Sequence, residues 1–162
     1  MPPEQRWRWS VCCANCVVEL AIRRLAAGRR WSRRLAMQAV YQWQMTGQPA
    51  DEIERQFREN PDFVKADCEY WQALLYGVVD RAGELDAALA EHMVWRMEHV
   101  DPVERAILRC ACIELLQRPD VPFKVIINEA VELTKKFGAE QGHKFVNGVL
   151  DKLAPRLRPL RR

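Results

Sequence analysis

Residues 120–155 read DVPFKVIINEAVELTKKFG and then AEQGHKFVNGVLDKLAP, and this stretch decides which fold the chain can adopt. Pro122 suits the first turn of a helix, where its missing N–H group costs nothing. Apolar residues then recur at helical spacing as far as Gly138, and glycine commonly ends a helix. A second apolar stripe follows and stops at Pro155. The stretch therefore predicts two short helices joined by a tight turn.

The region before this hairpin also has helical spacing. Residues 29–46 predict a helix, residues 52–58 a short second one, and residues 64–89 a long amphipathic one whose apolar positions step by four and three. In the first helix one face is apolar, and we expect the opposite face to be exposed. The residues on that opposite face are Arg30, Arg33, Arg34, Gln38 and Tyr41.

A further helix is predicted between the long helix and the hairpin. Asp101, Pro102 and Glu104 have the residue types of an N-cap, a first turn and a capping box. Its inward face is predicted to consist of Val103, Ile107, Ala111 and Leu115. Because no segment alternates with the period of a strand, we expect an all-α fold of two small helical subdomains packed together. These are a three-helix N-terminal half, residues 29–92, and a helical C-terminal half, residues 101–155.

Composition and charge restrict the classes of function. The chain is 49% hydrophobic and 29% charged, as in ordinary soluble proteins, and no apolar run reaches the roughly 18 residues of a membrane span. Residues 1–34 contain eight arginines against two glutamates, and residues 154–162 add four arginines. Since the whole chain carries +3, residues 35–153 carry −7. Basic ends on an acidic body suggest an anionic ligand, or simply solvated termini.

The first 28 residues form an atypical extension. Arginines flank the apolar patch at residues 11–22, but Asn15 and Glu19 interrupt it, so we do not expect an export signal. We expect weak helix or disorder there, assign it no function, and expect residues 156–162 to form a basic tail. The cysteine cluster at residues 12–16 lacks a second ligand pair at zinc-finger spacing, so we expect no metal. Reduced thiols fit a cytoplasmic protein.

No constellation of catalytic residues is apparent. His92, His99 and His143 do not have metal-ligand spacing, and the sequence contains no HExxH, nucleotide-binding glycine motif or GxSxG. We therefore expect neither catalysis nor a cofactor. The arginine-rich start of the residue 29–46 helix is a candidate for binding RNA, because arginine pairs with phosphate and aromatic rings stack on unpaired bases. The alternative is a helical adaptor that binds only proteins, with arginines that serve solubility.

The amino-acid sequences of several segments resemble those of the NusB family of transcription antitermination factors. The segments are RRWSR at residue 29, AMQAVYQWQ at residue 36, DPVERAILR at residue 101, ELL at residue 114, and residues 121–155. The resemblance covers residues 29–155. It implies a non-catalytic, all-helical factor that binds boxA RNA of nascent transcripts together with NusE, a ribosomal small-subunit protein. The pair would join the antitermination complex on RNA polymerase and support transcription of rRNA operons.

The resemblance also implies roles for particular residues. RNA-binding roles are implied for Arg29, Arg30, Arg33, Lys144 and Phe145, and contact with NusE is implied for Glu104 and Arg109. Periodicity alone would equally allow Phe145 to be a core aromatic residue and Glu104 to be a capping residue.

Three positions depart from the family pattern, namely Trp31, Arg34 and Gln141, and they affect the register of RNA on the protein. Homodimerisation, known in some relatives, is left open by the sequence.

Overall fold

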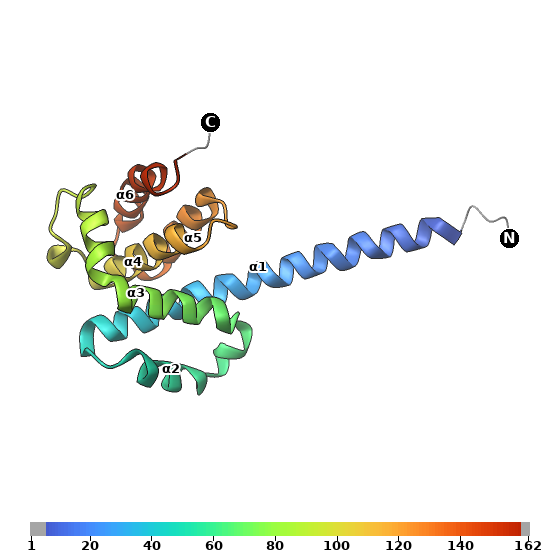
Figure 1. Ribbon diagram of the computed structural model, residues 1–162, viewed down its shortest axis with the longest axis horizontal. Coiled ribbons are helices and arrows are strands. Elements are labelled where there is room, and N and C mark those ends of the chain that lie inside the picture. The colour runs from blue at the N-terminus through green and yellow to red at the C-terminus, as the bar shows by residue number, and fades with distance from the viewer. Residues whose placement is uncertain (1–5, 160–162) are drawn as a thin grey trace.

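The computed structural model describes the backbone of residues 6–159 and the side chains of residues 16–159, and every regular element in that range is helical. The elements are α1 (Arg6–Thr46), α2 (Ala50–Arg58), the 3-10 helix η2 (Pro61–Lys65), α3 (Cys68–Ala90), the 3-10 helix η3 (Met97–His99), α4 (Pro102–Gln117), α5 (Phe123–Phe137) and α6 (Gly142–Leu157) (Figure 1). The all-α prediction is therefore confirmed. No helix within residues 6–159 is long and apolar enough to cross a membrane.

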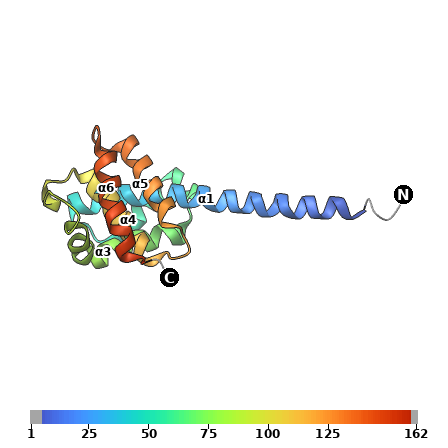
Figure 2. The same ribbon diagram turned by 90° about the horizontal axis from the view of Figure 1, so that it is seen from above.

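Helix α1 is 41 residues long, and its N-terminal part projects from the body of the molecule (Figures 1 and 2). We expected weak helix or disorder in residues 1–28; residues 6–28 are helical and continuous with the arginine-rich segment. No proline or glycine lies between residues 4 and 27 to interrupt the helix. The side chains of Val17, Val18, Leu20 and Ile22 are each at least 50% exposed, so this part of α1 contributes little to the core.

Helix α4 lies at the centre of the fold and packs against α1, α3, α5 and α6. Every residue from Ala106 to Leu115 is buried, including the polar ones. The prediction of one inward face is therefore incomplete, because α4 is buried on all sides over these residues. Val103, which we predicted to face inward, is only half-buried. Because α4 is surrounded by helices from both halves of the chain, the two halves share one hydrophobic core.

Helix α3 starts later than its apolar period predicts. Val64 lies in η2 and is 86% exposed, so its assignment to the long helix was wrong. The helix begins at Cys68 because the Asp67 carboxylate accepts a hydrogen bond from the Tyr70 N–H group at 3.2 Å and caps the first turn. Gly77 is required by packing, since a Cβ atom there would lie 2.7 Å from Ile113 Cγ1 on α4.

The predicted hairpin is confirmed as α5 and α6. The turn between them uses Gln141 in the left-handed region, with φ of 66°. We expected α6 to end at Pro155, but it continues to Leu157. Arg158 follows immediately, and its guanidinium donates to backbone carbonyls of Leu115 and Arg118. Arg158 of the expected basic tail is thus bound to the end of α4, whereas Arg156, at the end of α6, remains exposed.

Candidate nucleic-acid and protein-binding surfaces

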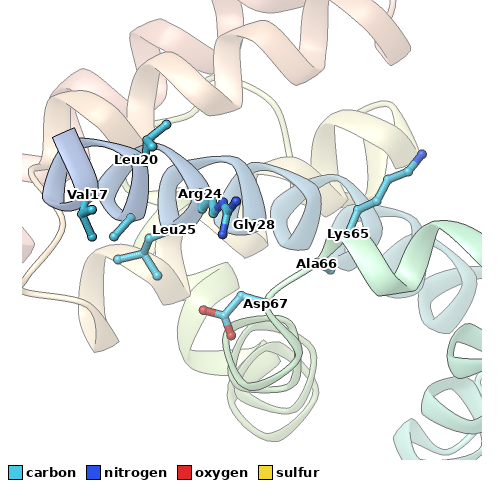
Figure 3. Close-up of a pocket in the computed structure, with 9 residues that line it drawn as sticks. Val17, Leu20, Arg24, Leu25, Gly28, Lys65, Ala66 and Asp67 are labelled. Atoms are coloured by element: carbon cyan, nitrogen blue, oxygen red, sulfur yellow. The ribbon is translucent and has the colours of Figure 1, made fainter. Parts of the chain in front are cut away.

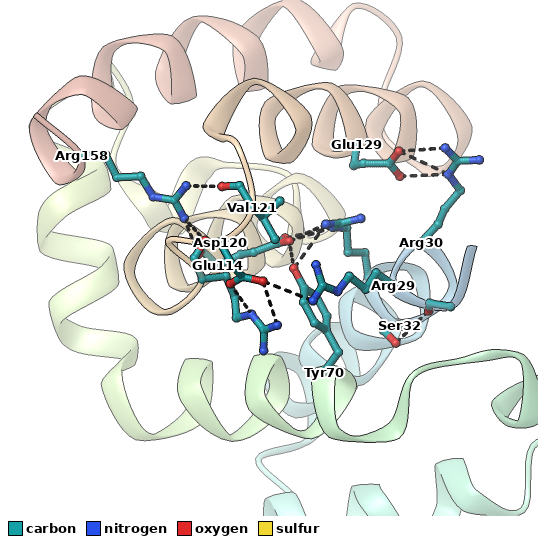
Figure 4. A network of polar contacts seen from close by, with 12 residues as sticks. Arg29, Arg30, Ser32, Tyr70, Glu114, Asp120, Val121, Glu129 and Arg158 are labelled. Carbon is teal, nitrogen blue, oxygen red and sulfur yellow. Dashed lines mark hydrogen bonds and ion pairs between the residues drawn. The ribbon is translucent and has the colours of Figure 1, made fainter. Parts of the chain in front are cut away.

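Arg30 presents its guanidinium to solvent beside the junction of α1 and α5 (Figure 4). Its side chain is 69% exposed, and its Nη2 atom lies 3.1 Å from Oε1 of Glu129, whose side chain is only 12% exposed. The carboxylate fixes one edge of the guanidinium and leaves the remaining N–H groups free to bind an anion. Of the three arginines for which the family resemblance implies RNA binding, Arg30 is the most exposed.

Arg33 is buried, which corrects the expectation that it shares the exposed face of α1 with Arg30. Its Nη2 atom lies 2.6 Å from Oε1 of Glu114 on α4, and its Nε atom donates to the same carboxylate at 3.0 Å. Burial lowers the pKa of Arg33, but the hydrogen bond and charge of Glu114 outweigh this and leave the pKa raised. Because α1 is enclosed by α3, α4 and α5, the face that carries Arg33 points into the protein.

The side chain of Arg29 is intermediate in exposure between those of Arg30 and Arg33. Its side chain is 20% exposed, and its Nη2 atom is 3.2 Å from Oδ2 of Asp120, on the segment between α4 and α5. Its guanidinium also lies over the Tyr70 ring, 4.9 Å from the centroid, and Arg118 contacts the same ring and the same carboxylate. Arg29 therefore ties α1 to the α4–α5 segment and retains only a small solvent-facing edge.

Arg34 is half-buried and extends the cations of α1 from Arg30 towards the end of α5. It lies one helical turn after Arg30, and its guanidinium is 5.1 Å from the centroid of the Phe137 ring and 5.1 Å from that of Trp31. Phe137 is the last residue of α5 and immediately precedes the turn that leads to Lys144. The cations of α1 thus extend to the end of α5, which the α5–α6 turn separates from Lys144.

Lys144 and Phe145 occupy the first turn of α6. Lys144 is exposed, whereas Phe145 is half-buried and packs against the hydrophobic core with part of its ring. The remaining part lines a pocket of about 600 Å³ together with Trp95, Val100 and Glu104. Phe145 is therefore both a packing residue and an accessible aromatic surface.

Glu104 is buried at 6% exposure and faces the α5–α6 turn. Asp101 caps α4 as predicted by accepting a hydrogen bond from Val103 N–H at 2.9 Å. The Glu104 carboxylate instead contacts Gly142 and accepts a hydrogen bond from the Ala139 backbone. Burial raises the pKa of Glu104 and the charge of Asp101 raises it further, while the Ala139 hydrogen bond opposes them.

Arg109 is also buried, on a different side of α4 from Glu104. It donates two hydrogen bonds to the Asp86 carboxylate, at 2.8 and 2.7 Å, and one to Gln44 at 2.8 Å. This arrangement joins α4 to α3 and α1. The structure therefore does not bring Glu104 and Arg109 together on one open surface.

Two polar residues that the sequence did not single out complete the site's framework. Tyr70 donates a hydrogen bond to Glu114 and so shares this carboxylate with Arg33; burial and the charge of Glu114 raise its pKa (Figure 4). Arg158 donates to the carbonyl of Val121 and thereby holds the segment that carries Asp120. No local pattern marks either residue, since their partners lie 37 or more positions away in the chain.

Within residues 16–159, no group of three or more His, Cys, Asp or Glu side chains could hold a metal ion.

Comparisons with known proteins agree with the resemblance seen in the sequence. A model of the NusB family matches residues 30–155. The chain is 53% identical over 133 residues to the transcription antitermination protein NusB of Pseudomonas savastanoi pv. phaseolicola, covering 82% of this chain and 81% of that protein. The match therefore extends over nearly all of the compact body of the fold.

Solved structures show the same architecture. The NusB of T. maritima superposes with a TM-score of 0.71 at 28% identity, covering 78% of this chain and 89% of the other. A structure of the antitermination factors NusB and NusE in complex with double-stranded RNA contains a chain that matches with a TM-score of 0.67 at 27% identity. That match covers 79% of this chain and 96% of the other chain.

Proposed function

The chain belongs to the NusB family, and we propose that it is a transcription antitermination factor that binds boxA RNA together with NusE. NusB antitermination factors are non-catalytic regulatory proteins, so the chain is not an enzyme. In the proposed role the heterodimer of this protein with NusE joins the antitermination complex on RNA polymerase in the cytoplasm and supports transcription of rRNA operons. A similar solved chain, crystallised with NusE and RNA, supports this choice of partners.

The observation that carries the RNA-binding proposal is the set of cations Arg30, Arg34 and Lys144, of which Arg30 and Lys144 are exposed and Arg34 is half-buried against Phe137. Arg30 offers free guanidinium N–H groups, and Arg34 is held beside the end of α5 by the Phe137 ring. Phosphates would bind to these cations, and the accessible part of Phe145 would stack on an unpaired base. Such a combination of cations and an aromatic ring is typical of single-stranded RNA sites.

The buried arginines have a different part in this proposal. Arg33 and the largely buried Arg29 hold α1 against α4 and the α4–α5 segment, and they thereby fix the orientation of Arg30. Arg29 can add a contact through its exposed edge. A family motif of three arginines thus divides here into one residue that faces the ligand and two that chiefly position it.

We assign the contact with NusE to the side of the molecule where α4 begins. The 91–101 segment exposes Val94 by 94% and Trp95 by 65%, next to the pocket that contains Glu104 and Phe145. Exposed aromatic residues beside a pocket are common in protein interfaces. Glu104 would then support this surface by fixing the α5–α6 turn, and Arg109 would support it indirectly by fixing α4 against α3 and α1.

The test is a titration of fluorescent boxA RNA and a scrambled RNA of equal length, each with and without NusE. We expect preferential binding of boxA, tighter in the presence of NusE, and a decrease in affinity with salt that reports the number of phosphate contacts. Equal weak binding of both RNAs that disappears at modest salt, with NusE binding retained, would favour a protein-binding adaptor and contradict the RNA-binding proposal.

A further inference from the structure

We propose that the projecting part of α1, residues 16–28, extends the RNA-binding surface and takes nucleotides that flank boxA. This inference rests on the proposed function, but it concerns residues that mostly precede the family match at residues 30–155. Two separate features support it, an arginine that continues the face of Arg30 and a groove between α1 and η2.

Arg23 lies on the same face of α1 as Arg30. The two residues are seven positions apart, which is two helical turns, or about 10 Å along the axis. Their side chains are 74% and 69% exposed. Arg23 is paired with Glu19 at 2.9 Å, but an exposed pair within one helix is weak and can yield to a phosphate. The phosphate-binding face of α1 therefore continues beyond the body of the protein.

The groove is lined by α1 on one side and by residues 65–67 on the other (Figure 3). Its volume of about 710 Å³ is in the range of sites for small molecules. Leu20, Ala21 and Leu25 supply an apolar wall, while Arg24 and Lys65 add cations. The carboxylate at its edge, Asp67, already caps α3. An apolar wall bordered by cations suits a base with its phosphates.

Trp31 connects this groove with the rest of the basic surface. The Nζ atom of Lys65 lies 4.5 Å from the centroid of its ring, and the Arg34 guanidinium lies 5.1 Å from the same point. Lys65 also pairs with Asp62 at 2.7 Å, where both side chains are about half exposed. Trp31 thus holds cations from two elements close together. Because this residue departs from the family pattern, we expect the flanking contact to be particular to this chain.

The groove lies on a different side of α1 from Arg23 and Arg30, and Trp31 lies between them, in contact with Lys65 of the groove and with Arg34 of the proposed RNA surface. RNA is the occupant that fits best because of this link and because Arg24 and Lys65 supply cations for phosphate. The experiment compares boxA RNA with RNAs lengthened by a few nucleotides at the 5′ or the 3′ end, in the presence of NusE. The full-length protein should bind one lengthened RNA more tightly by roughly 5- to 150-fold, the factor for one stacked base.

The variants are Arg24→Gln on α1 and Lys65→Gln on η2, with Arg156→Gln as the control of equal charge change. Arg156 pairs with Glu91 at the end of α3 remote from Asp67, so it lies away from the groove. We expect both groove variants to reduce the advantage of the lengthened RNA at least threefold without altering the affinity for boxA alone, and the control to alter neither.

The inference is overturned if the lengthened RNAs bind no better than boxA. It is also overturned if Arg24→Gln and Lys65→Gln, like the control, leave the advantage of the lengthened RNA unchanged. These results are distinguishable from failure of the proposed function, in which boxA itself would not be preferred over the scrambled RNA. A groove that binds a protein would leave all RNA affinities unchanged in the groove variants and would equally contradict the inference.

Discussion

The carboxylate of Glu104 occupies the space that a Cβ atom would need at position 142, where the chain has glycine. Glu104 belongs to the first turn of α4, and Gly142 is the first residue of α6. This contact holds the start of α6 against the central helix and so fixes the position of Lys144 and Phe145. The surface assigned to NusE and the surface assigned to RNA are therefore mechanically connected at Glu104.

A substitution at this contact tests the connection. Gly142→Ala should displace the Glu104 carboxylate, break its hydrogen bond with the Ala139 backbone, and reduce the free energy of unfolding by about 1–3 kcal/mol. The loss should largely disappear in a Glu104→Ala background, where the added methyl group has room. Urea unfolding of the two single variants and the double variant measures this coupling.

Gly148 provides the matched control on the same helix. A Cβ atom at Gly148 would meet nothing within 4 Å, so Gly148→Ala should stabilise α6 by up to about 1 kcal/mol through helix propensity alone. Equal effects of alanine at positions 142 and 148 would show that Glu104 does not constrain the start of α6.

The raised pKa of Glu104 leads to a prediction of pH dependence. A carboxyl whose pKa is higher in the folded protein than in the unfolded chain binds its proton more strongly when folded, so its contribution to stability falls as pH rises. The change begins near the ordinary value of 4.5 and ends above the raised value in the folded protein. Glu104→Gln removes this titration.

The free energy of unfolding of Glu104→Gln minus that of the wild type should therefore increase between pH 4 and pH 7, by about 1.4 kcal/mol for each unit by which the pKa is raised, because only the wild type loses stability over this range. Chemical unfolding at several pH values measures the difference. A constant difference across this range would show that Glu104 titrates alike in the folded and unfolded states.

Local signals were sufficient to predict most helices. The α5–α6 hairpin was predictable because proline, glycine and apolar spacing act within a few residues. The start of α3 was not, because Val64 continues the apolar period by chance while the capping hydrogen bond at Asp67 sets the boundary. The central position of α4 could not be predicted from the sequence pattern, since a helix covered on all sides has no distinctive polar face.

The candidate site was only partly predictable for a related reason. Periodicity placed Arg33 with the exposed residues because a charged side chain in a helix is usually solvated. Its partner Glu114 lies 81 positions away in the sequence, and only the tertiary fold shows that the two charges neutralise each other in the core. The pairing of Arg109 with Asp86 could not be predicted from the sequence for the same reason.

The buried ion pair of Arg33 and Glu114 should be costly to break from one side. Arg33→Ala leaves the Glu114 carboxylate buried with Tyr70 as its remaining partner, which should reduce the free energy of unfolding by about 3–5 kcal/mol. Replacing both residues with apolar ones of similar volume, as in Arg33→Met with Glu114→Leu, should cost less than Arg33→Ala. Thermal and urea unfolding of the three proteins measure this order, and the reverse order would mean that the pair itself is strongly stabilising.

Charge and stacking at the proposed RNA surface can be separated by substitutions at Arg30 and Phe145. Arg30→Gln removes one exposed cation, so it should weaken boxA binding and reduce the slope of log affinity against log salt by about 0.7, the value for one phosphate contact on a single strand. Arg156→Gln is again the control, because it removes an equally exposed arginine from the far end of α6. Wild-type affinity in a folded Arg30→Gln protein would exclude Arg30 from the RNA site.

Phe145→Ala should weaken the same binding by a different route. If the accessible part of the ring stacks on a base, its loss costs about 1–3 kcal/mol of binding free energy and leaves the salt slope unchanged, because no charge is removed. The ring also packs on the core, so circular dichroism and urea unfolding must first show that the variant is folded at the temperature of the titration. Phe145→Leu supplies the second comparison, since it restores apolar volume but not a ring. RNA affinity recovered fully by leucine would assign Phe145 to packing alone, whereas affinity lost in both folded variants requires the aromatic face.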